Sequence, residues 1–208
     1  MKQSWLKKLI VGAAMILGIS AANAEPWQAL PKPMPVNNPK KIEVVEFFWY
    51  GCPHCYHLEP SLEKWAKTQP ADVDFRRIHA AWNTGMQVHA QLYFTVQTLK
   101  LEDKLNMPIF NAIHKDNVEL RDTDVLTDWI GKQAGVNKDV FMKTYNSFSA
   151  QTYAKLAPQK TKDYGINAVP TFVVGGKYMT SVADANGNEA QFYKNLNQLI
   201  QKVRSEKK

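Results

Sequence analysis

The sequence predicts an α/β fold in which an all-helical segment is inserted between the two parts of a sheet-and-helix domain. Strand-like apolar runs occur only in residues 40–82 and 163–208. Residues 83–162 between them show helical periodicity alone. The two outer parts together supply enough strands and helices for one sheet covered by helices.

The first 24 residues have the pattern of a cleavable secretory signal peptide. A basic start is followed by an apolar stretch at residues 9–19 and by the small-residue sequence Ala22-Asn23-Ala24. A membrane anchor is the alternative, but the apolar stretch is shorter than the roughly 20 residues that span a bilayer. The sequence therefore predicts an exported protein whose mature chain starts at Glu25.

The strand and helix predictions then follow the chain in order. Residues 25–39 are rich in proline and are expected to form an extended arm. Residues 40–49 are apolar on both faces of a strand, which predicts a place in the middle of a covered sheet. A helix follows with Pro60 inside it, where we expect a kink or a break, and residues 73–81 form a second strand.

The inserted segment and the C-terminal part complete the pattern. Residues 168–174 form a strand, Gly175-Gly176 a hairpin turn and residues 177–181 the return strand. A final amphipathic helix ends in a basic tail, which we interpret as a solvated helix end and not as a nucleic-acid site. Five helices are predicted in the insertion, at residues 84–100, 103–115, 123–134, 138–145 and 150–164.

Cys52 and Cys55 are the only cysteines, and they stand two residues apart between a predicted strand and a predicted helix. This context favours a dithiol redox site. A structural disulfide is a poor alternative, because closing so short a loop removes little entropy from the unfolded chain. The pair therefore predicts thiol–disulfide chemistry.

The residues around Cys52 are of types that stabilise a thiolate. Cys52 falls at the N-terminal edge of the helix, where unpaired N–H groups and the dipole favour an anion. Pro53 suits the first helical position. His54 adds a cation beside the sulfur if it is protonated, and otherwise is a bystander on an exposed turn. We expect Cys52 to be the exposed, attacking sulfur, Cys55 the sheltered one, and the disulfide a strong oxidant.

Glu46 is an unusual residue for an apolar central strand, because a buried carboxylate is costly unless it is paired or partly protonated. Two roles stay open for it. It could form a structural ion pair with Arg76 or Arg77, or it could accept the proton of Cys55 during exchange.

Val169-Pro170 opens the strand predicted at residues 168–174, a position where proline is tolerated. If the bond is cis, the turn would expose backbone groups that could pair with an extended substrate. The sequence leaves both isomers open.

These residues resemble the thioredoxin superfamily and, within it, the DsbA-type disulfide oxidoreductases. The resemblance rests on Glu46, on the Pro53-His54 dipeptide between the two cysteines, on the helical insertion and on Val169-Pro170. It implies a thioredoxin-like fold with Cys52 as the nucleophile, Cys55 as the resolving thiol and Glu46 as the buried acid. It also implies that Val169-Pro170 is a cis-proline loop facing the disulfide and binding substrate. A lowered pKa of the nucleophilic cysteine is characteristic of that family, so the resemblance also implies that the pKa of Cys52 is lowered.

The resemblance further implies an exchange cycle in the periplasm. A thiolate of a reduced, newly exported polypeptide attacks Cys52, and the polypeptide leaves oxidised. A membrane DsbB-type, quinone-linked partner then reoxidises the pair. No cofactor is expected beyond the redox-active Cys52–Cys55 disulfide, and the protein is expected to be a monomer without a nucleic-acid partner.

Two other functions stay open at this point. An isomerase or reductase could use the same fold, although such enzymes need dimerisation or a dedicated electron donor. A metal carrier would use Cys52, Cys55, His54 and His57, although we interpret His57 as a surface residue. Adjacent residues at a helix start do not converge on a closed site, so no metal ligand is predicted.

Overall fold

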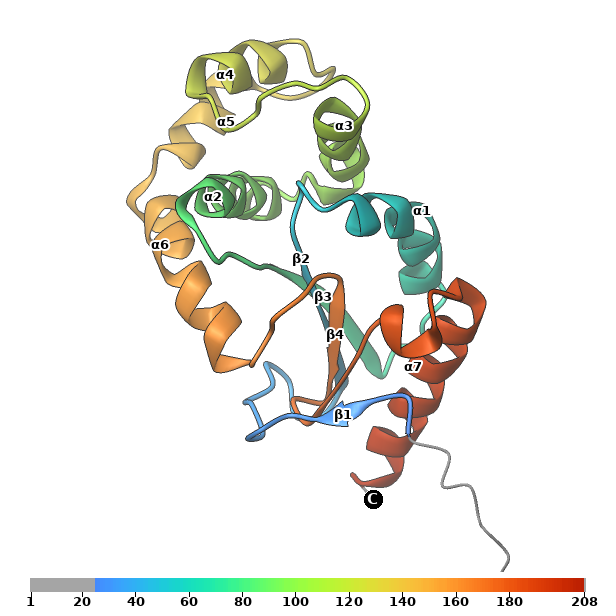
Figure 1. Ribbon diagram of the computed structural model, residues 1–208. Helices are drawn as coiled ribbons and strands as arrows, with labels where there is room; N and C mark the ends of the chain where they lie inside the picture. The colour runs from blue at the N-terminus through green and yellow to red at the C-terminus, as the bar shows by residue number, and fades with distance from the viewer. Residues whose placement is uncertain (1–24, 208) are drawn as a thin grey trace, which may run out of the picture.

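The computed structural model describes residues 25–207, so the predicted signal peptide lies outside the described residues. A five-stranded sheet in the order β1-β5-β4-β2-β3 forms the centre of one lobe (Figure 1). β2 and β3 are parallel, and the other neighbouring strands are antiparallel. The strands are β1 (Gln28–Ala29), β2 (Ile42–Phe48), β3 (Val73–His79), β4 (Thr171–Val174) and β5 (Tyr178–Thr180).

β2 is the central strand that the sequence predicts, and all seven of its residues are buried. Ile42 and Val44 pack on one face of the sheet against α1 (Pro53–Lys67) and α7 (Glu189–Ser205). These two helices lie side by side in Figure 1. On the other face, Val45 and Phe47 pack against Tyr164 and Ile166. Burial on both faces explains why apolar residues occupy both parities of this strand.

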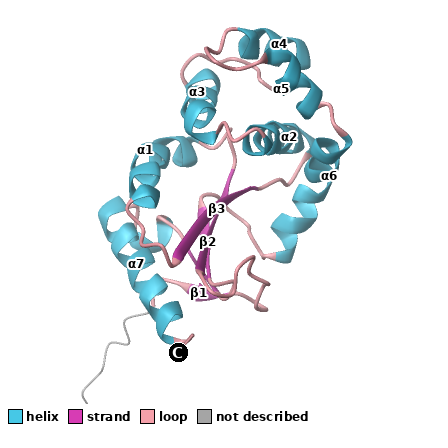
Figure 2. Ribbon diagram, turned by 180° about the vertical axis from the view of Figure 1, so that it is seen from behind, coloured by secondary structure: helices cyan, strands magenta, loops and turns pink. Residues whose placement is uncertain are grey.

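Five consecutive helices between β3 and β4 build the second lobe, which lies beyond the end of β2 (Figures 1 and 2). Their core is continuous with the end of β2, because Phe48, Tyr50 and Cys55 belong to the same cluster of buried side chains as Phe110 and Phe141. The redox motif therefore lies where the two lobes meet. The helices are α2 (Thr84–Thr98), α3 (Glu102–His114), α4 (Thr123–Gly131), α5 (Lys138–Tyr145) and α6 (Phe148–Asp163).

Several predicted elements begin or end up to three residues from the observed bounds, and three local predictions differ further from the structure. The proline-rich arm contains a short strand, because β1 pairs with β5. The strand predicted at residues 168–174 begins only at Thr171, since residues 168–170 form a loop instead. Pro60 lies inside the continuous helix α1, so no break occurs there. A helix loses one backbone hydrogen bond at such a proline, and tertiary packing of the apolar face offsets that loss.

Candidate redox site

Cys52 ends a tight turn and caps a helix. Its backbone N–H donates to the Trp49 carbonyl at 2.9 Å, which closes the turn after β2. Cys52 has extended backbone angles and is the N-cap residue of α1, and Pro53 follows as the first helical residue. The Cys55 N–H donates to Cys52 Sγ at 3.4 Å. The sulfur thus accepts a hydrogen bond from one of the backbone N–H groups that have no partner within the helix, as the sequence predicts.

The two cysteines are free thiols, and both are more enclosed than predicted. Cys52 is 5% exposed and Cys55 1% exposed, so the expectation of an exposed Cys52 is wrong in degree. The reason is tertiary: the Val169 carbonyl lies 3.4 Å from Cys52 Sγ and accepts a hydrogen bond from its thiol. The order of exposure, with Cys55 the more sheltered sulfur, follows the prediction.

The surroundings of the two sulfurs shift their pKa values in opposite directions. The pKa of Cys52 falls to about 6. The hydrogen bond from the Cys55 side chain is the largest cause; the N–H groups of Cys55 and His54 and the charge of His54 add to it, against the opposing effect of burial. Burial, followed by the bond to Cys52 and its charge, raises the pKa of Cys55 well above the ordinary value. Near neutral pH the pair therefore holds one thiolate, on Cys52.

Glu46 forms the ion pair that was one of its two predicted roles. Its Oε2 accepts from Arg77 Nε at 2.9 Å, whereas Arg76 pairs with Glu43. Burial raises the pKa of Glu46 against the lowering effect of the Arg77 charge. The charge of Glu46 also contributes to the raised pKa of Cys55. Proton exchange with Cys55 stays a prediction.

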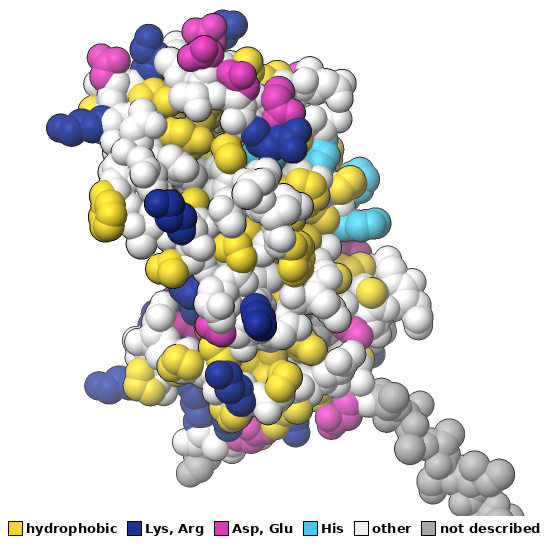
Figure 3. Space-filling model, turned by 60° about the vertical axis from the view of Figure 1, so that its left-hand side comes forward, with side chains coloured by type: hydrophobic (Ala, Val, Ile, Leu, Met, Phe, Trp, Pro, Cys, Tyr) yellow, Lys and Arg dark blue, Asp and Glu magenta, His cyan; other side chains and the backbone are white. Residues whose placement is uncertain are grey.

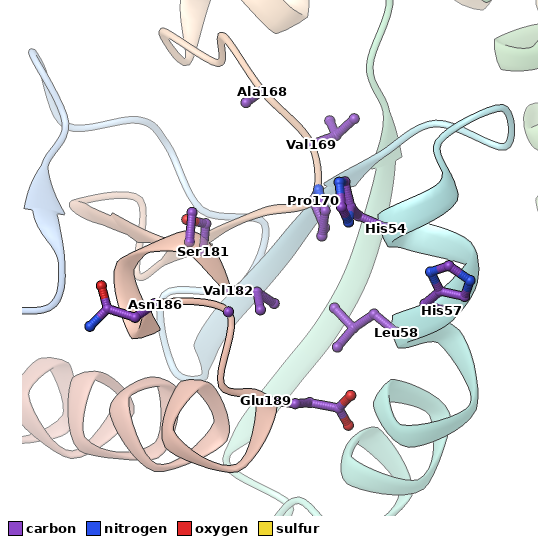
Figure 4. Close-up of a pocket in the computed structure, with 12 residues that line it drawn as sticks. His54, His57, Leu58, Ala168, Val169, Pro170, Ser181, Val182, Asn186 and Glu189 are labelled. Carbon is purple, nitrogen blue, oxygen red and sulfur yellow. The ribbon is translucent and has the colours of Figure 1, made fainter.

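A pocket of about 620 Å³ opens beside the motif. The Val169–Pro170 bond in its wall is cis. His54 lies beside Pro170, and the carboxylate of Glu189 points from the start of α7 toward α1 (Figure 4). Figure 3 shows histidine side chains gathered at one edge of the molecule next to exposed hydrophobic ones. The remaining lining residues include His57, Leu58, Ala168, Ser181, Val182, Ala183 and Asn186.

Two kinds of feature are absent from the described residues. Residues 25–207 contain no group of three or more histidine, cysteine, aspartate or glutamate side chains placed to hold a metal ion. In the same part of the chain, no helix combines the length and the apolar character needed to cross a bilayer.

The sequence matches the family described as DSBA-like thioredoxin domain over residues 43–196. The chain belongs to this DsbA-like family. The thiol:disulfide interchange protein DsbA of Burkholderia cepacia is 40% identical over 192 residues, which cover 87% of this chain and 90% of the relative. The protein of the same name from Bordetella pertussis is 41% identical over 180 residues, covering 86% and 85%.

Solved structures give the same result. Pseudomonas aeruginosa DsbA matches with a TM-score of 0.81 at 38% identity, covering 87% of this chain and 93% of that one. The oxidoreductase NmDsbA1 from Neisseria meningitidis matches with a TM-score of 0.79 at 32% identity, covering 88% and 94%. The thioredoxin-like fold and the DsbA-type resemblance are confirmed, and the chain is a protein disulfide oxidoreductase.

Sequence reasoning missed one charged residue of this DsbA-type site. Glu59 is 1% exposed on α1, and both of its carboxylate oxygens accept from Arg77 at 3.0 Å. Arg77 therefore serves two buried carboxylates, Glu46 and Glu59. A signal was present, because Glu59 stands at helical spacing between Cys55 and Leu62, where the inward-facing positions of α1 lie.

Proposed function

We propose that this DsbA-type oxidoreductase works in the periplasm and donates the Cys52–Cys55 disulfide to reduced, exported polypeptides. The observation that carries the proposal is the inequality of the two sulfurs, with the pKa of Cys52 at about 6 and that of Cys55 raised. A thiol of low pKa is the better leaving group in thiol–disulfide exchange. A mixed disulfide on Cys52 therefore resolves readily toward oxidised substrate.

The exchange has two steps. A substrate thiolate attacks Cys52 Sγ, a mixed disulfide forms, and the bond between the two protein sulfurs breaks. Cys55 leaves with the electron pair and takes a proton. We propose that the buried carboxyl of Glu46 supplies this proton and accepts it back from Cys55 when the pair is reoxidised. A second substrate thiolate then attacks the substrate's own sulfur and expels Cys52 as a stabilised thiolate. The substrate loses two electrons, and the dithiol of the protein holds them.

The pocket beside the motif supports a place for the substrate chain. Val169-Pro170 and Leu58 give it an apolar wall next to Cys52, and the Val169 carbonyl already contacts the sulfur that the substrate thiolate attacks. An extended peptide bound there would bring its cysteine to Cys52. Val169 and Pro170 are the residues that we propose for substrate binding.

Reoxidation completes the cycle. Because the reduced pair holds two electrons and only thiols, we propose that a membrane DsbB-type, quinone-linked partner removes them by the same exchange chemistry. No cofactor beyond the cysteine pair is needed in this scheme, and a monomer suffices. The low pKa of Cys52 favours donation over a reductase role, because it stabilises the reduced form.

A trapping experiment tests this function. Cys55→Ala removes the resolving thiol, so mixed disulfides on Cys52 should accumulate in the periplasm and appear on non-reducing gels. Their components, identified by mass spectrometry, should include exported cysteine-containing proteins and a membrane protein. Cys52→Ala is the matched control and should capture nothing. If Cys55→Ala captures nothing while Cys52 is shown to be a free thiol, the proposal is wrong.

A further inference from the structure

Three histidines outside the redox motif contact the turn that leads into Cys52. This turn, residues 49–52, is tight, since a Cβ atom at Gly51 would collide with the Trp49 indole. Its conformation decides where the Cys52 sulfur lies relative to α1. The three histidines come from three different elements, β3, α2 and α3.

Two of the histidines bind the backbone of Tyr50. His79, at the end of β3, is fully buried, and its Nε2 accepts from the Tyr50 N–H at 3.3 Å. His114, at the end of α3, lies with its Nε2 2.7 Å from the Tyr50 carbonyl. A carbonyl only accepts, so this nitrogen carries the hydrogen. Both backbone polar groups of Tyr50 thus have a histidine partner.

The third histidine holds the Trp49 side chain. His89, on α2, is 4% exposed, and its Nδ1 accepts from the Trp49 indole N–H at 3.0 Å. An acceptor nitrogen must be unprotonated. Burial lowers the pKa of His89 to about 4 and that of His79 well below its ordinary value, so both rings stay neutral near neutral pH.

The helix α3 makes further contacts on both sides of Cys52. Asn106 Oδ1 accepts from the Tyr50 hydroxyl at 2.7 Å, before the cysteine in sequence. Asn111 Oδ1 accepts from the Tyr56 hydroxyl at 2.8 Å, after the motif. The Tyr56 ring also stacks on His114, with centroids 4.9 Å apart and planes 5° from parallel. The helix α3 of the inserted lobe therefore contacts both the turn at residues 49–52 and the first turn of α1.

We propose that His79, His89 and His114 are positioning residues for thiol–disulfide exchange. They fix residues 49–52 so that Cys52 Sγ stays at the start of α1 and against the Val169 carbonyl. Their hydrogen bonds go to Trp49 and Tyr50, so they act through the turn. The inference rests on the proposed function and assigns the helical insertion a task in it.

The geometry makes the sulfur sensitive to a small movement of the turn. Its hydrogen bonds to the Cys55 N–H and to the Val169 carbonyl are both 3.4 Å long. Hydrogen bonds weaken steeply as distance and angle depart from their optimum. Releasing one anchor of the turn should therefore weaken the bond from the Cys55 N–H, which stabilises the Cys52 thiolate. The Val169 carbonyl accepts a hydrogen bond only from the protonated thiol, so it fixes the position of the sulfur without stabilising the thiolate.

Substitution by glutamine and by leucine separates positioning from packing. Glutamine offers an N–H donor at position 114 and a carbonyl acceptor at position 89, whereas leucine fills space with neither. We expect His114→Leu and His89→Leu to raise the Cys52 pKa by about one unit, measured from thiolate absorbance against pH. Alkylation of Cys52 at about pH 5 should slow about threefold in these variants. About tenfold less of the protein would carry the thiolate, but a thiolate of higher pKa is the stronger nucleophile and partly offsets the loss. Both glutamine variants should stay close to the wild type.

The controls make the outcome decisive. Lys115→Gln removes an exposed charge at the same helix end and should leave the Cys52 titration unchanged. Circular dichroism and urea unfolding show whether each variant is folded, and a role in stability alone would shift the unfolding midpoint without shifting the titration. The inference is overturned if folded leucine variants titrate like the wild type, or if glutamine fails as leucine does. Failure of the proposed function would be seen in the wild-type protein instead, because its Cys52 would then titrate near the ordinary thiol value of 9.0.

Discussion

Cys52 owes its reactivity to several small contributions that converge on one sulfur. The side chain of Cys55, two backbone N–H groups and the charge of His54 all lower its pKa, and burial alone opposes them. None of these groups is unusual. What is unusual is the turn that brings them to the same atom, and Cys55 has no comparable set of donors.

His54 gives a direct test of the charge contribution at this sulfur. His54→Ala removes the imidazole and keeps the backbone N–H, so the Cys52 pKa should rise above about 6 but stay below 9.0. The ultraviolet absorbance of the thiolate, followed against pH in the reduced protein, measures it. Lys64→Gln, further along α1 on its exposed side, is the matched control. An unchanged midpoint in His54→Ala would show that the imidazole is a bystander.

The strand β2, the strand β3 and the helix α1 are joined beneath the motif by a buried charge cluster. Arg77 on β3 binds Glu46 on β2 and Glu59 on α1. One guanidinium cannot neutralise two carboxylates. Burial is the main cause of the raised pKa values of both acids, and it raises the pKa of Glu59 to about 8. The cluster therefore keeps a proton near neutral pH, close to the site where exchange needs one.

This cluster predicts a pH dependence of stability. The pKa of Glu59 is raised from 4.5 to about 8 in the folded protein. Its stabilising contribution is complete below the unfolded value and is lost as pH rises toward 8. Glu59→Gln removes this titration. Between about pH 4.5 and pH 8, the free energy of unfolding of the variant should therefore rise relative to that of the wild type by at most about 1.4 kcal/mol per pH unit.

Urea unfolding at several pH values measures the effect. Asp103→Asn removes an exposed carboxylate of α3 and should leave the pH profile parallel to that of the wild type. Parallel profiles for Glu59→Gln as well would mean that Glu59 titrates normally and that the cluster holds no proton.

Local patterns predict the elements well and their long-range partners poorly. The strand before Cys52, the helix after it and the Gly175-Gly176 turn each follow from a few neighbouring residues, and both glycines have the positive φ that such a turn needs. The contact of Cys52 with Val169 joins residues 117 positions apart, so only the family resemblance pointed to it. Glu59 and the three histidines of the turn were missed for the same reason, because their roles depend on residues that only the fold brings near.

The division into two lobes gives each a distinct part in the site. The sheet lobe supplies β2, the start of α1 and the cis-proline loop, whereas α2 and α3 of the helical lobe hold the turn between them. The core of the helical lobe includes both cysteines. A change in the redox state of the pair therefore acts within the core of the helical lobe, which makes stability a readout of redox chemistry.

Two opposing effects set the stability of the oxidised form relative to the reduced form. Closing the short loop between the cysteines favours the oxidised form by about 2 kcal/mol at any pH. The thiolate of Cys52 favours the reduced form, and its contribution grows as pH rises from about 6 toward 9.0. By about pH 8 the thiolate contributes about 2.7 kcal/mol, which exceeds the effect of the loop.

The free energy of urea unfolding, measured for both redox forms between about pH 5 and pH 8.5, tests the stabilised Cys52 thiolate most directly. Effects of carboxylates such as Glu59 cancel in the difference, because both forms contain them. Above about pH 6, the free energy of unfolding of the reduced form should rise relative to that of the oxidised form by about 1.4 kcal/mol per pH unit, until the reduced form is the more stable. A difference that does not change with pH, or one that moves toward the oxidised form, would contradict a Cys52 thiolate that drives disulfide donation.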